Sequence, residues 1–548
     1  MRRTLALLFL ALAAVGCRKS ASSSTTDAGV TAASAEWLDG RLPKDDSSPV
    51  DGGTLVVRLM IEPASLNSLD DGSNDATVHR IMHGTVVESL LELDRVTYQL
   101  APGLAAKWTE SDDHRTDTFV LRDATFSDGA KLTAADVVAT LDVVMDTARP
   151  TGTIRGTLSS LASWKAIDPK TVEVTWKEAS PFSLRALAQL PILSAKQLEG
   201  EWAAVGQAPI GTGPFVVGPW KRGESLTLTR RPGGAAWLDT LTFRFVKDHA
   251  AAGAVFEKGE FDLMTNITPQ LWRALEKDEP STAWARTGWN RIRSFDSSYS
   301  YIGWNERRPM FADARVRQAF AHLYDAQLIA KVVDLELELP TTCPYLRGSD
   351  SCSTAVKPIP FSPADAKRLL DEAGWKDGDG DGVREKDGVP LKFTFLLPGS
   401  SVRLGRIVPL LQEQLKAAGA VMEIERVETT TLSARVAKRD FDVVSRVWTE
   451  FDREQELTQM FHSSQIEKGS NFVGYSNAEV DRLIDEVHRE FDEGKRRALE
   501  RSLHEKLYAE QPYLFMTNRQ SLDAAKRRVH GLQPSLLWYD LRRVWVSN

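Results

Sequence analysis

Between Gly53 and the C-terminus, segments patterned as β-strands alternate with segments patterned as α-helices. The strands are short apolar or alternating runs bounded by turn residues, and the helices repeat apolar residues with a period near 3.6. We predict strands at 54–60, 118–122, 171–176, 225–230, 241–246, 391–397, 421–426 and 441–448, and helices at 75–91, from 133, and at 313–334, 363–373, 404–418, 477–491 and 495–509. This interleaving indicates mixed α/β domains. Because 548 residues exceed what one hydrophobic core supports, we expect two or three domains.

The first residues are typical of a secretory signal peptide. Arg2 and Arg3 precede an apolar run, 5–15, that is shorter than the roughly 20 residues needed to cross a bilayer. The run ends Ala14-Val15-Gly16-Cys17, which resembles the bacterial lipobox and implies a signal peptide of residues 1–16 and diacylation of Cys17. The alternative is an ordinary signal peptide with a chance cysteine. Residues 17–50, rich in Ser, Ala and Thr, predict a flexible tether.

Charge and hydropathy exclude two classes of protein. A formal net charge of −7 leaves no basic face for nucleic acid and no basic stripe for an anionic membrane. We expect no transmembrane helix beyond the signal, because no later stretch is long and apolar enough. Two further cysteines, Cys343 and Cys352, lie nine residues apart in an exported chain. We predict a short-loop disulfide, the alternative being two free thiols.

Several motifs in fixed order cover nearly the whole chain after the tether. They are Gly53-Thr54-Leu55-Val56-Val57, Glu62-Pro63, Glu88-Ser89-Leu90, Pro102-Gly103-Leu104-Ala105, Leu132-Thr133-Ala134-Ala135-Asp136-Val137, Gly211-Thr212-Gly213-Pro214-Phe215, Gly259-Glu260-Phe261-Asp262, Val316-Arg317-Gln318-Ala319-Phe320, Ala373-Gly374-Trp375 and Gly474-Tyr475-Ser476-Asn477. Together they resemble the bacterial extracellular solute-binding proteins of family 5, which include peptide-, nickel- and sugar-binding lipoproteins of ABC importers.

The resemblance implies a bilobed α/β periplasmic-binding-protein fold, class II-like and of cluster C, with an extra domain inserted in the N-terminal lobe. By analogy, residues 51–290 form lobe I and include the inserted domain at about 86–184. Residues 291–515 form lobe II, and residues 516–548 return to lobe I.

The resemblance places ligand contacts on the segment 441–454. In peptide-binding members this strand pairs with the ligand backbone, and an aspartate three residues after a tryptophan binds the terminal amine. Here Trp448 matches, but Asp452 comes one residue late. Either a bulge restores the carboxylate or the ligand is not an ordinary free-amine peptide. The predicted cleft contacts are Trp448, Asp452, Glu450, Arg446, Tyr301 and Asn305; for these residues, lobe surface or core packing is the alternative.

Two other motifs could bind metal. Asp377-Gly378-Asp379-Gly380-Asp381-Gly382 has the alternating carboxylates of a calcium loop, but Gly388 stands where the loop's last glutamate belongs. A solvated turn is the favoured interpretation. His79 and His83 are four residues apart, with Arg80 between them and no third ligand nearby in sequence. We therefore predict no metal site and no cofactor.

The function implied by the resemblance is solute capture for an ABC importer. We expect a monomeric lipoprotein on the periplasmic side of the envelope that binds oligopeptides or similar solutes, closes about a hinge and docks on permease subunits. A nickel chelate or an oligosaccharide is an alternative ligand, and a transport-independent structural or chaperone-like lipoprotein is an alternative of another class. No nucleophile–base motif indicates an enzyme.

Overall fold

The computed structural model describes residues 47–547, apart from residues 74–75, 96, 277–287, 400, 450–451, 453, 468 and 536–537. The predicted signal peptide, Cys17, most of the predicted tether and the candidate contact Glu450 lie outside these residues. Within the described ranges, no helix combines the length and the apolar character needed to cross a membrane.

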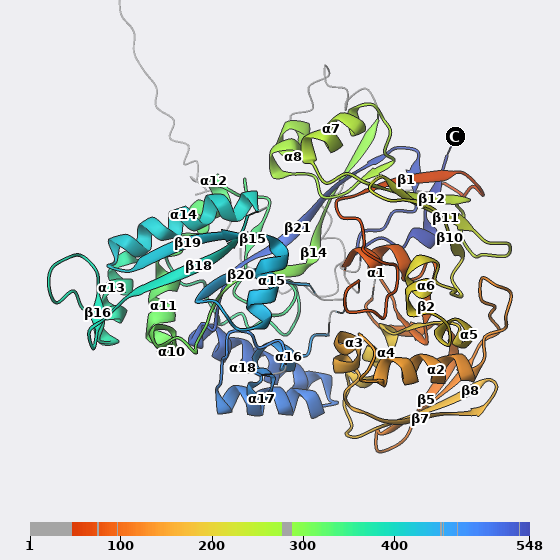
Figure 1. Ribbon diagram of the computed structural model, residues 1–548, viewed down its shortest axis with the longest axis horizontal. Helices are drawn as coiled ribbons and strands as arrows, with labels where there is room; N and C mark the ends of the chain where they lie inside the picture. Colours follow the sequence, from red (N-terminus) through yellow and green to blue (C-terminus); the bar gives the residue numbers. More distant parts are fainter. Residues whose placement is uncertain are drawn as a thin grey trace, which may run out of the picture.

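One large sheet runs through both halves of the molecule (Figure 1). Its path in the described chain is β10 (Phe215–Lys221), β11 (Ser225–Arg230), β12 (Thr240–Phe245), β1 (Thr54–Leu59), β13 (Leu263–Met264), β21 (Tyr513–Lys526), β14 (Trp289–Trp304), β20 (Val443–Thr449), β18 (Lys392–Pro398) and β19 (Val421–Val427), and β15 (Leu339–Pro340) pairs with β21. Strands β14 and β21, 16 and 14 residues long, pair antiparallel along most of their length. They are the two strands that pass from one half to the other.

The first half has its own apolar core, built from residues between Leu55 and Ile292 and joined by residues between Ala525 and Val546 near the chain's end. It also holds a four-stranded antiparallel sheet, in the order β5 (Ala105–Glu110), β6 (Thr116–Leu121), β8 (Thr171–Trp176) and β7 (Leu161–Asp168). Helix α2 (Ala134–Met145) begins at Thr133, whose backbone N–H donates to the Asp136 carboxylate at 2.9 Å. This is the capping-box start that the sequence predicts.

The second half is built from residues 299–516 and has two apolar clusters, one on each face of its strands. One cluster packs helices α11 (Ala314–His322), α13 (Pro363–Glu372) and α14 (Val402–Ala417) against β18. The other packs α15 (Thr429–Ala437), α16 (Thr458–Phe461), α17 (Ala478–Arg489) and α18 (Glu493–Glu510) against the opposite face. Figure 1 shows α17 and α18 beside the first half, near α3 (Gly152–Thr157) and α4 (Ser183–Ala188).

Short elements connect these layers. In the first half they are α1 (Ala76–Met82), β2 (Glu88–Ser89), β3 (Leu91–Leu93), β4 (Leu100–Pro102), β9 (Pro191–Ile192), α5 (Ala195–Leu198), α6 (Trp202–Gln207), α7 (His249–Glu257), α8 (Pro269–Glu276), β22 (Val529–His530), η3 (Leu541–Arg543) and β23 (Trp545–Val546). In the second half they are α10 (Pro309–Ala312), α12 (Ala326–Val332), β16 (Glu385–Lys386), β17 (Val389–Pro390) and η2 (Ser463–Gln465).

Two predicted helices are wrong in length. The helix expected at 75–91 ends at Met82, because Gly84 adopts φ 78° and donates to the Val87 carbonyl, which turns the chain into β2. The helix expected at 313–334 is two helices. Asp325 begins the second one as an N-cap, its side chain accepting from the Leu328 N–H at 2.9 Å.

Candidate functional site

Strand β20 has a free edge over most of its length. On one side it pairs with β14 along all its residues. On the other side, parallel pairing with β18 involves only Val443 and Val444. No described strand pairs with residues 445–449 on that side. This edge can therefore offer backbone donors and acceptors to an added strand.

Three of the predicted contact residues lie together on β20 and β14. Trp448 and Arg446 are opposite Tyr299 and Tyr301 in the antiparallel register, so their side chains share one face of the sheet. The Tyr301 ring stacks on Tyr513 at 3.9 Å between ring centroids and lies parallel to Trp448 at 6.3 Å. Tyr301 is 2% exposed, and burial raises its pKa to about 12. Tyr301 thus supports Trp448 from inside the core.

Arg446 carries the positive charge of this strand. Its side chain is half-buried, and its guanidinium carbon lies 5.8 Å from the centre of the Phe472 ring. Among the described residues, no carboxylate pairs with it. A guanidinium without a partner acid can bind a carboxylate in two-pronged geometry.

Asp452 makes an ion pair with a residue from the other half of the molecule. Its Oδ1 lies 2.6 Å from Nη1 of Arg185 on α4, and the two side chains are 6% and 12% exposed. Burial raises the pKa of the Asp452 carboxyl, and Arg185 opposes that rise. Asp452, one of the predicted cleft contacts, therefore already has an ion-pair partner in Arg185.

The Asn305 side chain makes hydrogen bonds inside the second half of the molecule. Its Nδ2 donates to the carbonyls of Phe441 at 2.7 Å and Arg439 at 3.2 Å, and the side chain is 1% exposed. These bonds fasten the end of β14 to the turn before β20. The position is next to the strand that carries Trp448, but the side chain points into the protein.

Arg185 contacts a predicted site residue, and no sequence pattern indicated this contact. It lies 267 positions before Asp452, and no local pattern distinguishes it from other arginines on short helices. The family motifs predict the position of β20 in the sequence. They do not predict which side chain of the first half contacts the segment after it.

A disulfide joins Cys343 and Cys352, with an S–S distance of 2.08 Å. The loop that it closes lies against the Asp452 segment, because the Leu346 N–H donates to Oε1 of Gln455 at 2.9 Å. It also lies on α18, where Ser351 Oγ donates to the Glu500 carboxylate at 2.6 Å. The loop therefore connects the segment after β20 to the longest helix of the second half.

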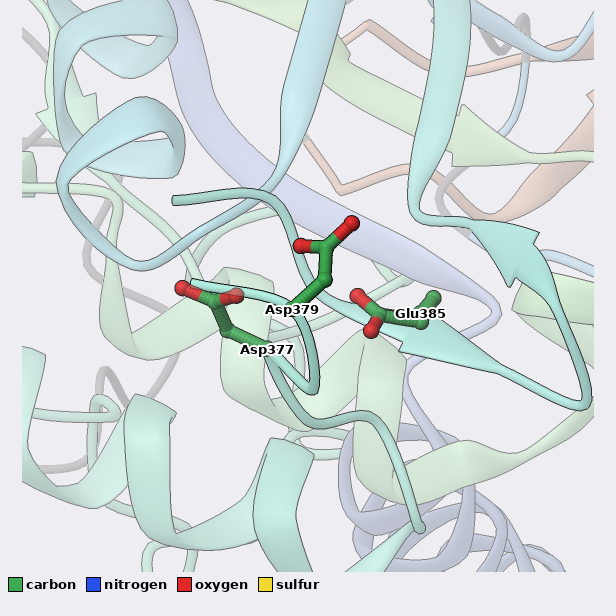
Figure 2. A group of neighbouring side chains, drawn as sticks. All are labelled: Asp377, Asp379 and Glu385. Carbon is green, nitrogen blue, oxygen red and sulfur yellow. The ribbon is translucent and has the colours of Figure 1, made fainter. Parts of the chain in front are cut away.

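The acidic turn brings together Asp377, Asp379 and Glu385, whose carboxylate oxygens lie within 4.8 Å of one another (Figure 2). Both aspartates are exposed and the glutamate is half-buried. Asp377 accepts from the Gly380 N–H at 2.7 Å, and Glu385 accepts from the Gly378 N–H at 2.7 Å. These carboxylates thus stabilise the backbone of the turn.

His79 and His83 stack with ring centroids 3.9 Å apart on α1 and just after it. Burial lowers the pKa of both rings, that of His83 to about 4. The described residues bring no third metal-ligating side chain to the pair, since their one possible three-ligand group is the acidic turn. The pair packs as neutral rings.

Known proteins resemble this chain along most of its length. The model of the bacterial extracellular solute-binding proteins, family 5 Middle, matches residues 99–468. The oligopeptide-binding protein AppA of Bacillus subtilis (strain 168) is 29% identical over 545 residues, which cover 92% of this chain and 94% of AppA. The solved structure of AppA from Bacillus subtilis in complex with a nonapeptide matches with a TM-score of 0.79 at 27% identity, covering 91% of this chain and 100% of that one.

A more distant structure shares the fold. NikZ from Campylobacter jejuni in complex with Ni(L-His) matches with a TM-score of 0.76 at 22% identity, covering 90% of this chain and 99% of that one. The family model alone spans more than half of the chain. The predicted family and fold class are thus confirmed: the chain belongs to the bacterial extracellular solute-binding proteins of family 5 and has their bilobed α/β fold.

Proposed function

We propose that this protein is the substrate-binding protein of an ABC importer and captures oligopeptides or similar small solutes. The observation that carries the proposal is the free edge of β20 at residues 445–449, on the strand that bears Trp448 and Arg446. An extended solute can add to this edge through main-chain bonds, which depend little on its side chains. A relative that covers most of the chain is named an oligopeptide-binding protein, and its solved structure holds a nonapeptide.

Capture would proceed by closure of the two lobes. Strands β14 and β21 are shared by both lobes, so bending within these strands changes the angle between the lobes. A solute that contacts both lobes stabilises the closed form through contacts made only there. The closed form would then dock on the permease subunits, as a monomer and without catalysis.

The proposed location is the periplasmic side of the membrane, with Cys17 lipidated. The support is the signal-like start of the chain and the small residues before Cys17. The tether of residues 17–50 would let the lobes stand away from the membrane.

Native mass spectrometry of the full chain, extracted in mild detergent without denaturation, tests the proposed function. A family of bound masses that fragment as short peptides is expected. A single bound mass of another chemistry would replace the peptide by that solute. An empty protein that gains no thermal stability from a peptide pool would contradict solute capture of this kind.

A further inference from the structure

The Arg185–Asp452 pair joins the two lobes, and Asp452 comes three residues after the last residue of β20. We propose that Arg185 is a specificity residue that supplies a built-in cation to Asp452, so that the site takes solutes whose group beside Asp452 is not positively charged. This inference rests on the proposed function and concerns the class of solute.

The pair joins the lobes because its two residues lie on segments that pack into different apolar cores. Arg185 lies on α4, whose Leu187 is part of the first lobe's core. Asp452 precedes Leu457 and Met460, which belong to the second lobe. The two charged side chains are nearly closed to solvent, at 12% and 6% exposure. An arginine buried this far is not a screened surface charge, and it neutralises the carboxylate where it lies.

Both partners are held in place by other bonds. The second guanidinium nitrogen of Arg185, Nη2, donates to the carbonyl of Tyr98 at 3.2 Å. Oδ1 of Asp452 also accepts from the backbone N–H of Glu454 at 3.0 Å. The other oxygen, Oδ2, is buried without a hydrogen-bond partner among the described residues. A neutral N–H or O–H donor on the solute would satisfy Oδ2 without adding charge.

The charges around the pair are balanced before any solute arrives. Glu454, two residues after Asp452, is ion-paired with Arg497 and lies 3.6 Å from Nη2 of Arg496. Arg497 also donates to Glu500 at 2.9 Å. With Arg185 and Asp452, the little-exposed part of this group holds three guanidinium groups and three carboxylates, and the exposed Glu493 also lies 3.4 Å from Nη2 of Arg497. A solute ammonium group here would be a buried charge with no acid of its own, which is strongly disfavoured.

The charge that remains for a solute is positive. Arg446, six residues before Asp452, has no partner acid among the described residues. It therefore favours a carboxylate on a solute lying along β20, while the Asp452 end excludes an ammonium group. Arg446 at one end of this segment and the paired Asp452 at the other therefore favour the same class of solute. That class is neutral or acidic solutes, and it does not include solutes with a free amine.

Calorimetric titration with two probes tests the inference: tetraalanine, which carries a free amine, and N-acetyl-tetraalanine, which does not. The wild-type protein should bind the acetylated peptide at least tenfold more tightly. Arg185→Gln should reverse that order, because Asp452 then lacks a cation. The matched control is Arg368→Gln, whose arginine is 56% exposed on α13 and pairs with Glu372 and Asp365. Equal or tighter binding of tetraalanine to the wild type would overturn the inference.

Failure of both peptides to bind either protein would count against peptide capture, and the pair is then tested without solute. Hydrogen exchange of the ligand-free protein should be faster in Arg185→Gln, both in α4 and in residues 454–461, and unchanged in Arg368→Gln. This follows because the pair fastens the two segments to each other. Unchanged exchange in either segment would show that the pair does not hold the lobes, and would overturn the inference independently.

Discussion

His504 is held as a neutral ring by bonds on both sides. Its Nδ1 accepts from the Ser353 N–H at 2.9 Å, and its Nε2 donates to the Thr342 carbonyl at 2.9 Å. Burial lowers its pKa from the usual 6.5 to about 4. A proton added to Nδ1 would break the bond from the Ser353 N–H and place two hydrogens against each other. Because the unfolded chain takes up that proton first, the stability present above pH 6.5 is lost as the pH falls from 6.5 to 4.

Urea unfolding between pH 7 and pH 4.5 measures this loss. We expect the wild-type unfolding free energy to fall more steeply than that of His504→Gln, by about 2–3 kcal/mol over the range. Glutamine does not titrate, so the other groups contribute equally to both curves. Parallel curves for the two proteins would rule out His504 as the source.

Asn305→Ala separates two roles for that side chain. The amide donates to the buried carbonyl of Phe441 and the partly buried carbonyl of Arg439, so its loss should lower the unfolding free energy by about 2–3 kcal/mol. Since the side chain points into the protein, solute affinity of the folded variant should stay within twofold of the wild type. A large loss of affinity with little loss of stability would return Asn305 to the set of solute contacts.

At the residue scale, the sequence predicted the strand β20 but not the contacts that other segments make with it. The sequence placed Trp448 and Arg446 on one predicted strand and named Tyr301 as a cleft contact, and in the structure Tyr301 lies opposite Arg446 on the paired strand β14. The partner of Asp452 could not be predicted, because Arg185 is 267 residues away and depends on how the lobes meet. The orientation of Asn305 depends on backbone carbonyls, which leave no signal in the sequence.

At the scale of elements, the disulfide loop of residues 343–352 is a brace for the segment after β20. It bonds Gln455 on that segment and Glu500 on α18. Replacing both cysteines by serine should cost about 2–3 kcal/mol, the loop-closure value for ten residues. Hydrogen exchange should rise in residues 454–461 and stay unchanged in the distant β5–β8 sheet. An equal rise in both regions would show a global loss of stability instead.

Element lengths were predictable where local patterns decide them. Strands β8 and β11 match their predicted ranges, and α13, α14 and α18 differ by at most two residues at either end. The helix predicted at 313–334 is broken because Asp325 caps a new helix inside an unbroken apolar pattern. No local sequence pattern predicts the 16-residue length of β14. The strand is long because it runs through both lobes.

At the scale of the whole molecule, the lobes also touch at a place apart from the shared strands and the Arg185–Asp452 pair. Ser180 Oγ, just before α4, lies 3.5 Å from Nδ1 of His488 on α17. Glu178 lies 3.7 Å from the same ring, and His114 stacks on Phe491 at 4.0 Å between ring centroids. These contacts join the first lobe to the last turn of α17 and to the turn that follows it. They form when the lobes are together, because they belong to neither lobe's own core.

A short cross-link at this contact should therefore lock the lobes. In Ser180→Cys/His488→Cys, a short bis-maleimide should join the two cysteines, because Ser180 Oγ and His488 Nδ1 lie 3.5 Å apart in the native protein. Under the proposed function a captured solute leaves by hinge opening, so the cross-linked protein should release N-acetyl-tetraalanine at least tenfold more slowly than the single variant Ser180→Cys treated alike. Equal release rates would mean that solute leaves without separation of α4 from α17, and that closure at this contact is not what retains it.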